Sequence, residues 1–298
     1  PILIMFRFLV GLGVSLASVS QLAYMGDFFL YSTRGKAMGV VAMGFFGGYT
    51  FGVPLGALVA EVSGWRWTLC SFAAGMGGVW LGCLLGLPAL PSPQSPIRIS
   101  CFIRGVIALH RRRQPFLCLV IYACIGGSMT GFLAYAGEWM YRHFGFAITD
   151  RSQVFFWCGL TSLLFSPIAG IWADRSGKRT PAVTGSILIC LLMCAIPVLA
   201  QESLSVYPAF VVLAAGVALR HSPLLTLVTE VVCTERRGTF LAIKNAWTQL
   251  GAALGNLIAG ILYNYWGYQA VGLFSVSYTH LRAHETSLHL VCRLLLEK

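Results

Sequence analysis

The sequence predicts an all-α protein that crosses a membrane several times. Of its 298 residues, 57% are hydrophobic and only 10% are charged, and the mean hydropathy is +0.76. A soluble domain carries about 25% charged residues. The apolar residues form long continuous runs that do not alternate with polar residues. Because a backbone in lipid must satisfy its own hydrogen bonds, such runs predict membrane-spanning helices.

Eight apolar runs approach the ~20 residues that a helix needs to cross a bilayer. The alternative, a large soluble core of buried helices, is disfavoured by so many runs in succession. A ninth run starts near Tyr268 and loses its apolar character after about Phe274. The eight runs cover residues 2–24, 37–60, 66–87, 116–137, 153–173, 182–200, 206–229 and 239–263.

The basic residues between these runs are distributed unevenly. If successive connections lie on alternate faces, the first face receives thirteen basic residues and the second receives three. The first set is Arg34, Lys36, Arg98, Arg104, Arg111, Arg112, Arg113, Arg175, Lys178, Arg179, Arg236, Arg237 and Lys244, and the second is Arg66, Arg142 and Arg151. Basic residues favour the cytoplasmic side, so the first face is expected there. The net charge of +11 is therefore interpreted as a topology signal rather than as a nucleic-acid surface.

The chain also contains an internal repeat. A shift of 203 residues aligns glycines, an acidic pair and an Arg-Gly pair without a gap. The aligned pairs include Gly13 with Gly216, Asp27 with Glu230, Arg34 with Arg237, Gly35 with Gly238, Gly48 with Gly251, Gly52 with Gly255 and Gly64 with Gly267. Six helices separate the two copies, which predicts two parallel-repeated halves of six helices, as in one large class of transporters.

Three segments resemble the major facilitator superfamily. The sequence GIWADRSGKR, residues 170–179, resembles the family's loop motif G-x-x-x-D-R-x-G-[RK]-[RK]. RFLVGLG, with Arg7, Gly11 and Gly13, resembles its helix-4 motif R-x-x-x-G-x-G. GVPLGALVAEVSGWRW, residues 52–67, resembles helix 5 of the drug and sugar efflux branch, although Val53 interrupts the antiporter pattern and Ala57 replaces a glycine.

The resemblance implies an N-terminally truncated helical bundle that begins at helix 4. Residues 1–87 would be the rest of the N-terminal half, helices 4 to 6, and residues 88–115 a cytoplasmic linker with an amphipathic segment. Residues 116–274 would be the C-terminal half, helices 7 to 11 and the start of helix 12. Residues 275–298 carry several ionisable groups, resemble translated sequencing-adapter read-through, and are expected to be non-native and not to pack as a helix.

The loop motif suggests a conformational switch. We expect Gly170 and Gly177 to permit close approach and unusual dihedrals. In the resembled family such a loop latches the two halves together in one conformation. By that resemblance Asp174, Lys178 and Glu230 would form a cytoplasmic charge cluster, and Arg175 and Arg179 would belong to the same switch loop. The alternative is that these charges only set the topology and cap helices.

A second pattern is a stripe of small residues in the second apolar run. The stripe has a period of four, consists of Gly44, Gly48, Gly52, Gly56 and Ala60, and is joined by Pro54, which could kink the helix. Small residues at this spacing let helices approach closely in lipid. Close packing is the favoured interpretation, and sliding of helix 5 on a partner during transport is the alternative.

Charged groups inside apolar runs are candidates for substrate or coupling contacts. Arg220 lies within such a run beside His221, whereas Arg7 lies near a helix end, where it could extend to the membrane surface. Glu138 is a weaker candidate at an outer end. We expect Arg220 to face the central cavity, where it contacts substrate or the coupling ion; the alternative is structural pairing.

Together these patterns predict a secondary transporter that moves a small organic solute by alternating access. Proton-coupled efflux is favoured, a symporter or uptake carrier is the alternative, and a membrane enzyme is less favoured because no catalytic motif is present. The ten cysteines form no zinc-type pair, and no metal or cofactor is expected. The expected partners are the solute, protons and lipid, for a monomer that crosses a bacterial inner membrane many times.

Overall fold

The computed structural model describes residues 2–28, 44, 46–88, 99–177, 179–229 and 237–296. Within these ranges every regular element is a helix, which confirms the all-α prediction. The elements are α1 (Ile2–Phe28), the π-helical turn η1 (Gly48–Gly52), α3 (Val53–Ser63), α4 (Trp65–Gly86), α5 (Ile99–Arg111), α6 (Arg113–Phe144), α7 (Ile148–Ser176), α8 (Arg179–Leu199), α9 (Ser203–Thr229) and α10 (Arg237–Leu296).

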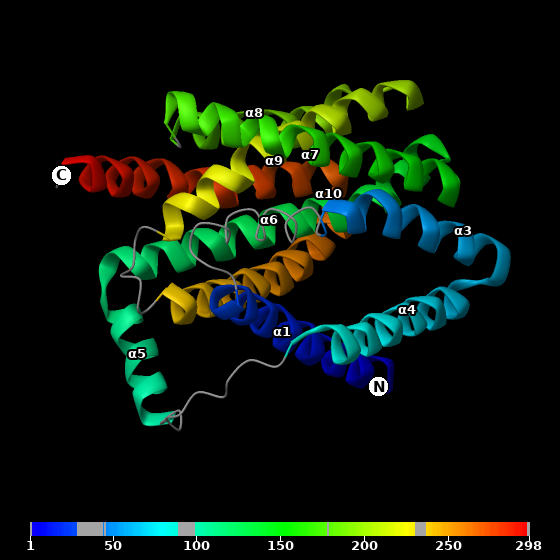
Figure 1. Ribbon diagram of the computed structural model, residues 1–298. Coiled ribbons are helices and arrows are strands. Elements are labelled where there is room, and N and C mark those ends of the chain that lie inside the picture. Colours follow the sequence, from blue (N-terminus) through cyan, green and yellow to red (C-terminus); the bar gives the residue numbers. More distant parts are fainter. Residues whose placement is uncertain are drawn as a thin grey trace.

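The long helices run back and forth between two ends of a bundle. At the left end of Figure 1, α6 begins, α7 ends, α8 begins, α9 ends and α10 begins, and α5 lies at this same end. Arg113 at the start of α6, Arg175 in the last turn of α7 and Arg179 at the start of α8 therefore lie at one end of the bundle. This placement agrees with the topology that the distribution of basic residues predicts.

Two glycines confirm the internal repeat at the level of the backbone. Gly64 separates α3 from α4 with φ 87° and ψ 161°, and Gly267 breaks α10 with φ 74° and ψ −172°. A residue with a Cβ rarely adopts such dihedrals. The two breaks are 203 residues apart, at positions that the sequence shift aligns. α10 thus consists of two helical segments, residues 237–266 and 268–296.

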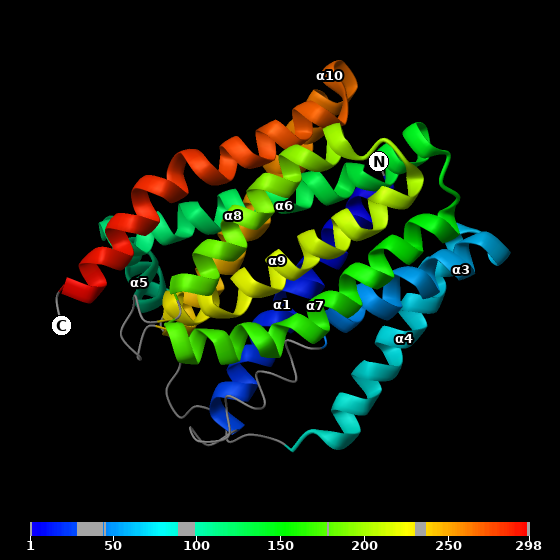
Figure 2. The same ribbon diagram turned by 90° about the horizontal axis from the view of Figure 1, so that it is seen from above.

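Small residues let α6 and the first segment of α10 pack closely. A Cβ built on Gly255 would overlap backbone atoms of Gly127, and one on Gly251 would overlap the carbonyl of Ala123. Lipid provides no hydrophobic driving force between helices. Close backbone-to-backbone contact instead holds them together by van der Waals attraction. After this contact with α6, the second segment of α10 runs beside α8 (Figure 2).

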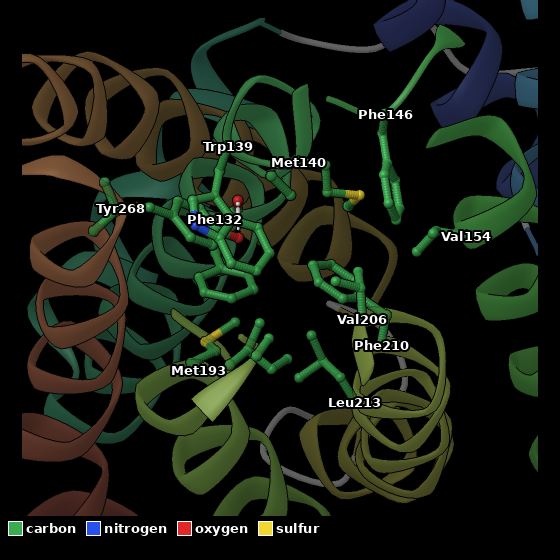
Figure 3. Close-up of a cluster of buried hydrophobic side chains, with 14 of the residues drawn as sticks. Phe132, Trp139, Met140, Phe146, Val154, Met193, Val206, Phe210, Leu213 and Tyr268 are labelled. Carbon is green, nitrogen blue, oxygen red and sulfur yellow. Dashed lines mark hydrogen bonds between the residues drawn. The ribbon is translucent and has the colours of Figure 1, made fainter. Parts of the chain in front are cut away.

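Aromatic side chains form the core where α6, α9 and the second segment of α10 meet (Figure 3). Phe132 is fully buried, its ring lies 4.9 Å from that of Tyr268, and it stacks on Phe210 at 6.3 Å. The Tyr268 hydroxyl donates a 3.1 Å hydrogen bond to the Phe132 carbonyl. The tyrosine therefore buries its ring without leaving its polar end unsatisfied.

The start of helix 12 packs further along the chain than the sequence predicts. Ser275 is fully buried and donates to the Ser128 carbonyl, and Val276 packs against the aromatic core. The backbone remains helical to Leu296, and Ser275 and Val276 pack although residues from about 275 onward were expected not to pack as a helix. Side chains from residue 278 onward lie outside the described ones. Whether this tail is native therefore stays a prediction.

The outer surface of the bundle is apolar. Among the described residues, five helices are long and apolar enough to cross a membrane, and two shorter apolar helices cover Ile4–Ser18 and Thr50–Ser63. α4 buries none of its residues, and side chains such as Trp80 and Leu84 are 65% and 61% exposed. A whole helix of exposed apolar side chains, such as α4, is rare on soluble proteins. The protein is therefore an all-α, polytopic membrane protein.

The linker forms the predicted amphipathic helix, α5, which packs against the bundle. Leu109 is buried beside Phe240 and Ile243 of α10. The Trp247 indole N–H donates a 3.2 Å hydrogen bond to His110 Nε2. One side of α5 is therefore held by helix contacts as well as by any contact with the membrane surface.

Replacing Trp247 with phenylalanine is expected to loosen α5. The change removes the hydrogen bond to His110 but keeps an aromatic ring in place. Loss of this hydrogen bond should weaken the docking of α5 on α10 by about 1 kcal/mol, which raises the population of undocked α5 roughly fivefold. Trypsin cleavage at Arg111–Arg113 measures this population, and Trp266→Phe, at an exposed site on the same helix, is the control. Equal cleavage rates in the two variants would show that the hydrogen bond does not hold α5.

Candidate functional site

The loop motif forms a very short turn between α7 and α8. α7 ends at Ser176 and α8 begins at Arg179. Gly177 has φ 84° and ψ 147°, which confirms the predicted need for glycine. Gly170 has no positive φ, and a Cβ built on it meets nothing within 4 Å. That part of the prediction is wrong, because α7 continues for six residues beyond Gly170 and the turn comes later.

The predicted charge cluster lies outside the described residues. The side chains of Asp174, Lys178 and Glu230 are not described. Arg175 is exposed and Arg179 is half-buried. The latch therefore stays a prediction.

The helix-4 motif lies on an open face of α1. Arg7 is exposed, and a Cβ on Gly11 or Gly13 would meet nothing within 4 Å. A side chain added at either glycine would therefore contact no described residue.

The glycine stripe has one close neighbour among the described residues. A Cβ on Gly56 would lie 3.1 Å from the Phe72 ring of α4, whereas Gly44, Gly48 and Gly52 face open space. Pro54 follows the π-helical turn η1. Because proline cannot donate a hydrogen bond to the preceding turn, the helix widens there.

A different face of the helix formed by η1 and α3 packs against α7. Thr50 is fully buried, and a Cβ on Gly159 of α7 would overlap it. The Phe51 and Phe156 rings meet edge to face at 6.5 Å. Sequence analysis missed this contact because Thr50 and Gly159 belong to no motif.

Glu138 has a cation partner of its own. Its carboxylate accepts a 2.6 Å hydrogen bond from Arg142, one helical turn later, and both side chains are exposed. An exposed pair of this kind contributes about 0–1 kcal/mol. The pairing does not support a role for Glu138 in substrate or ion binding.

Arg220 is buried with only 7% of its surface exposed. A Cβ on Gly185 of α8 would lie 2.8 Å from the Arg220 backbone nitrogen, so α8 and α9 pack closely at this point. The ring of the next residue, His221, meets the Phe46 ring edge to face at 5.9 Å.

Lys244 is a second buried cation, and its position corrects the interpretation of this lysine as a topology signal. It is 9% exposed, and its Nζ lies 4.6 Å from the centre of the Tyr122 ring. Lys244 sits seven residues inside α10, within an apolar run, and that depth was the signal available in the sequence. Nothing in the sequence indicated that Tyr122 would be the aromatic partner of Lys244.

Comparison with known proteins agrees with this architecture. The model of the Major Facilitator Superfamily matches residues 1–150 and 118–279. The uncharacterized MFS-type transporter YwfA of Bacillus subtilis (strain 168) is 26% identical over 287 residues, which are 92% of this chain and 67% of that protein. The uncharacterized MFS-type transporter YceJ of the same organism is 21% identical over 267 residues, covering 87% and 65%.

A crystal structure of a D-xylose-proton symporter has a similar fold. The TM-score is 0.71 at 18% identity, and the match covers 93% of this chain and 69% of the symporter. The chain spans about two thirds of the length of the curated relatives. Since the family model covers most of the chain, the protein belongs to the Major Facilitator Superfamily of transporters.

Proposed function

We propose that this protein is a secondary transporter that exports a small organic solute by alternating access in exchange for protons. The observation that supports this is the repeat of helices and helix breaks at Gly64 and Gly267. Two similar units can rock against each other around a central site. We place the protein, as a monomer, in a bacterial inner membrane and assign it no enzymatic role.

Uptake together with protons is the second candidate, because the similar crystal structure is that of a proton symporter. The two directions are separated in everted membrane vesicles with an acidic interior. Export in exchange for protons predicts that the vesicles accumulate solute, whereas symport predicts that preloaded vesicles release it. The protein is expressed from its complete reading frame, and the assay screens sugars, cationic drugs and organic acids. Movement of solute down its own gradient alone, with no response to pH, would contradict both candidates.

Asp174→Asn is expected to impair transport several-fold while membrane insertion stays normal. A charge contact at a helix end contributes about 0.3–1 kcal/mol, which is too little to unfold the protein. The same energy shifts a two-state balance if only one state makes the contact. Transport rate per inserted molecule is the measurement, and Glu138→Gln at an exposed site is the control. An unchanged rate would leave Asp174 as a topology signal.

A further inference from the structure

His110 connects the end of the linker helix α5 to α10. Its Nε2 accepts the 3.2 Å hydrogen bond from the Trp247 indole N–H, and its Nδ1 lies 2.8 Å from the Val106 carbonyl oxygen, one turn earlier in α5. The His110 and Trp247 rings lie 5.8 Å apart. The Phe116 ring of α6 lies 6.2 Å from the first and 5.7 Å from the second. The imidazole therefore sits where three helices meet, with both ring nitrogens in hydrogen bonds.

The two hydrogen-bond partners determine the protonation state of this imidazole. An indole nitrogen can only donate a hydrogen bond, and a backbone carbonyl oxygen can only accept one. Nε2 is therefore the acceptor, and Nδ1 carries the proton that bonds to the Val106 carbonyl. This is the neutral Nδ1–H tautomer. A second proton, on Nε2, would point at the Trp247 N–H, so the bond between α5 and α10 exists only while His110 is neutral.

Protonation has the opposite effect on α5 itself. His110 lies in the last turn of α5, where backbone carbonyls lack partners within the helix and the helix dipole favours a cation. The bond from Nδ1–H to the Val106 carbonyl survives protonation and becomes charge-assisted. The added proton thus stabilises the end of α5 while it removes the hydrogen bond to α10.

The other ionisable groups near this contact offer an imidazolium no negative partner, as far as the described residues of α5, α6 and α10 show. Their side chains are basic, or are a thiol and a phenol that are ordinarily neutral at pH 7. They are Arg104 and Arg111 of α5, Arg112 at the junction, Arg113, Cys118 and Tyr122 of α6, and Lys244 of α10. A charge on His110 would therefore be added to a basic surrounding, which favours its movement into water.

We propose that His110 is a pH sensor of the linker: the neutral imidazole holds α5 on α10, and protonation of Nε2 releases it. α5 is the last part of the linker between α4 and α6, so acid at the basic end of the bundle frees this connection. The proposal concerns the docking of α5 alone and is independent of the solute and of the direction of transport.

Trypsin cleavage at Arg111–Arg113 measures the release of α5 in the purified protein, expressed from its complete reading frame. Each rate is divided by that of a free peptide of residues 104–119 at the same pH, which removes the pH dependence of trypsin itself. We expect the ratio to rise about fivefold or more from about pH 8 to about pH 5.5, because protonation removes the hydrogen bond to Trp247.

Variants separate His110 from its surroundings. His110→Gln lacks the titratable ring, and Trp247→Phe lacks the donor that the added proton would oppose, so each should lose the pH response. Lys244→Met, which removes the lysine of α10, should keep it. His143→Gln, at an exposed histidine near the other end of α6, is the matched control and should also keep it.

NMR of nitrogen-labelled histidine side chains reports the tautomer directly, and His110→Gln identifies the signal. We expect the Nδ1–H form at about pH 8 and the doubly protonated ring at about pH 5.5. The proposal is overturned if the wild-type ratio does not change with pH, if His110→Gln or Trp247→Phe responds as the wild type does, or if Lys244→Met does not respond. An Nε2–H tautomer at about pH 8 would also overturn it. If His110→Gln does not fold, Trp247→Phe decides the outcome.

Discussion

Gly255→Leu is expected to abolish most of the folded protein. Any side chain at this position must occupy space that the Gly127 backbone fills. A flexible side chain could move aside, but the backbone of α6 cannot do so without separating from α10. Overpacking a well-packed core costs roughly 1–3 kcal/mol and sometimes more, and the rigid neighbour predicts a cost at or above the upper limit. This is a large part of a total stability of about 5–15 kcal/mol.

The measurement is the yield and thermal midpoint of the monodisperse protein in detergent. Gly75→Leu is the matched control, because a Cβ on Gly75 of α4 meets nothing within 4 Å. A normal midpoint for Gly255→Leu would mean that α6 and α10 do not cross as the structure describes.

Gly159→Leu is expected to separate the two halves while each half remains folded. The added side chain would overlap Thr50, which joins the helix of η1 and α3 to α7. Alternating access requires the two halves to move as coupled bodies. A displacement of about 1 Å at such a contact can lower a rate about 100-fold, and we expect transport to fall by at least about tenfold for the same reason.

Transport per inserted molecule and cross-linking between Phe51→Cys and Phe156→Cys test this prediction. These two rings lie 6.5 Å apart, so a short bis-maleimide should link the cysteines unless the variant separates the helices. Gly82→Leu, in open space on α4, is the control. Efficient cross-linking and normal transport in Gly159→Leu would show that this contact does not couple the halves.

Features that depend on the residue itself could be predicted from the sequence. The apolar runs, the repeat and the turn at Gly177 follow from hydropathy, spacing and the steric freedom of glycine. The contacts Thr50–Gly159 and Tyr122–Lys244 depend on how each helix is rotated and tilted against another, and no local pattern encodes this rotation. The packing of Ser275 and Val276 was missed for a related reason. Ser275 is polar, but the Ser128 carbonyl accepts its hydrogen bond, a partner that hydropathy cannot reveal.

The π-helical turn η1 has a mechanical consequence for the helix that contains it. In a regular α-helix, positions four residues apart are rotated by about 40°, so a stripe with this period winds around the axis like a screw thread. A turn with i→i+5 hydrogen bonds takes up an extra residue and reverses part of this winding. Gly48, Gly52 and Gly56 therefore run more nearly parallel to the axis. A neighbour following a thread must rotate as it advances, but along this straight seam it needs only to translate.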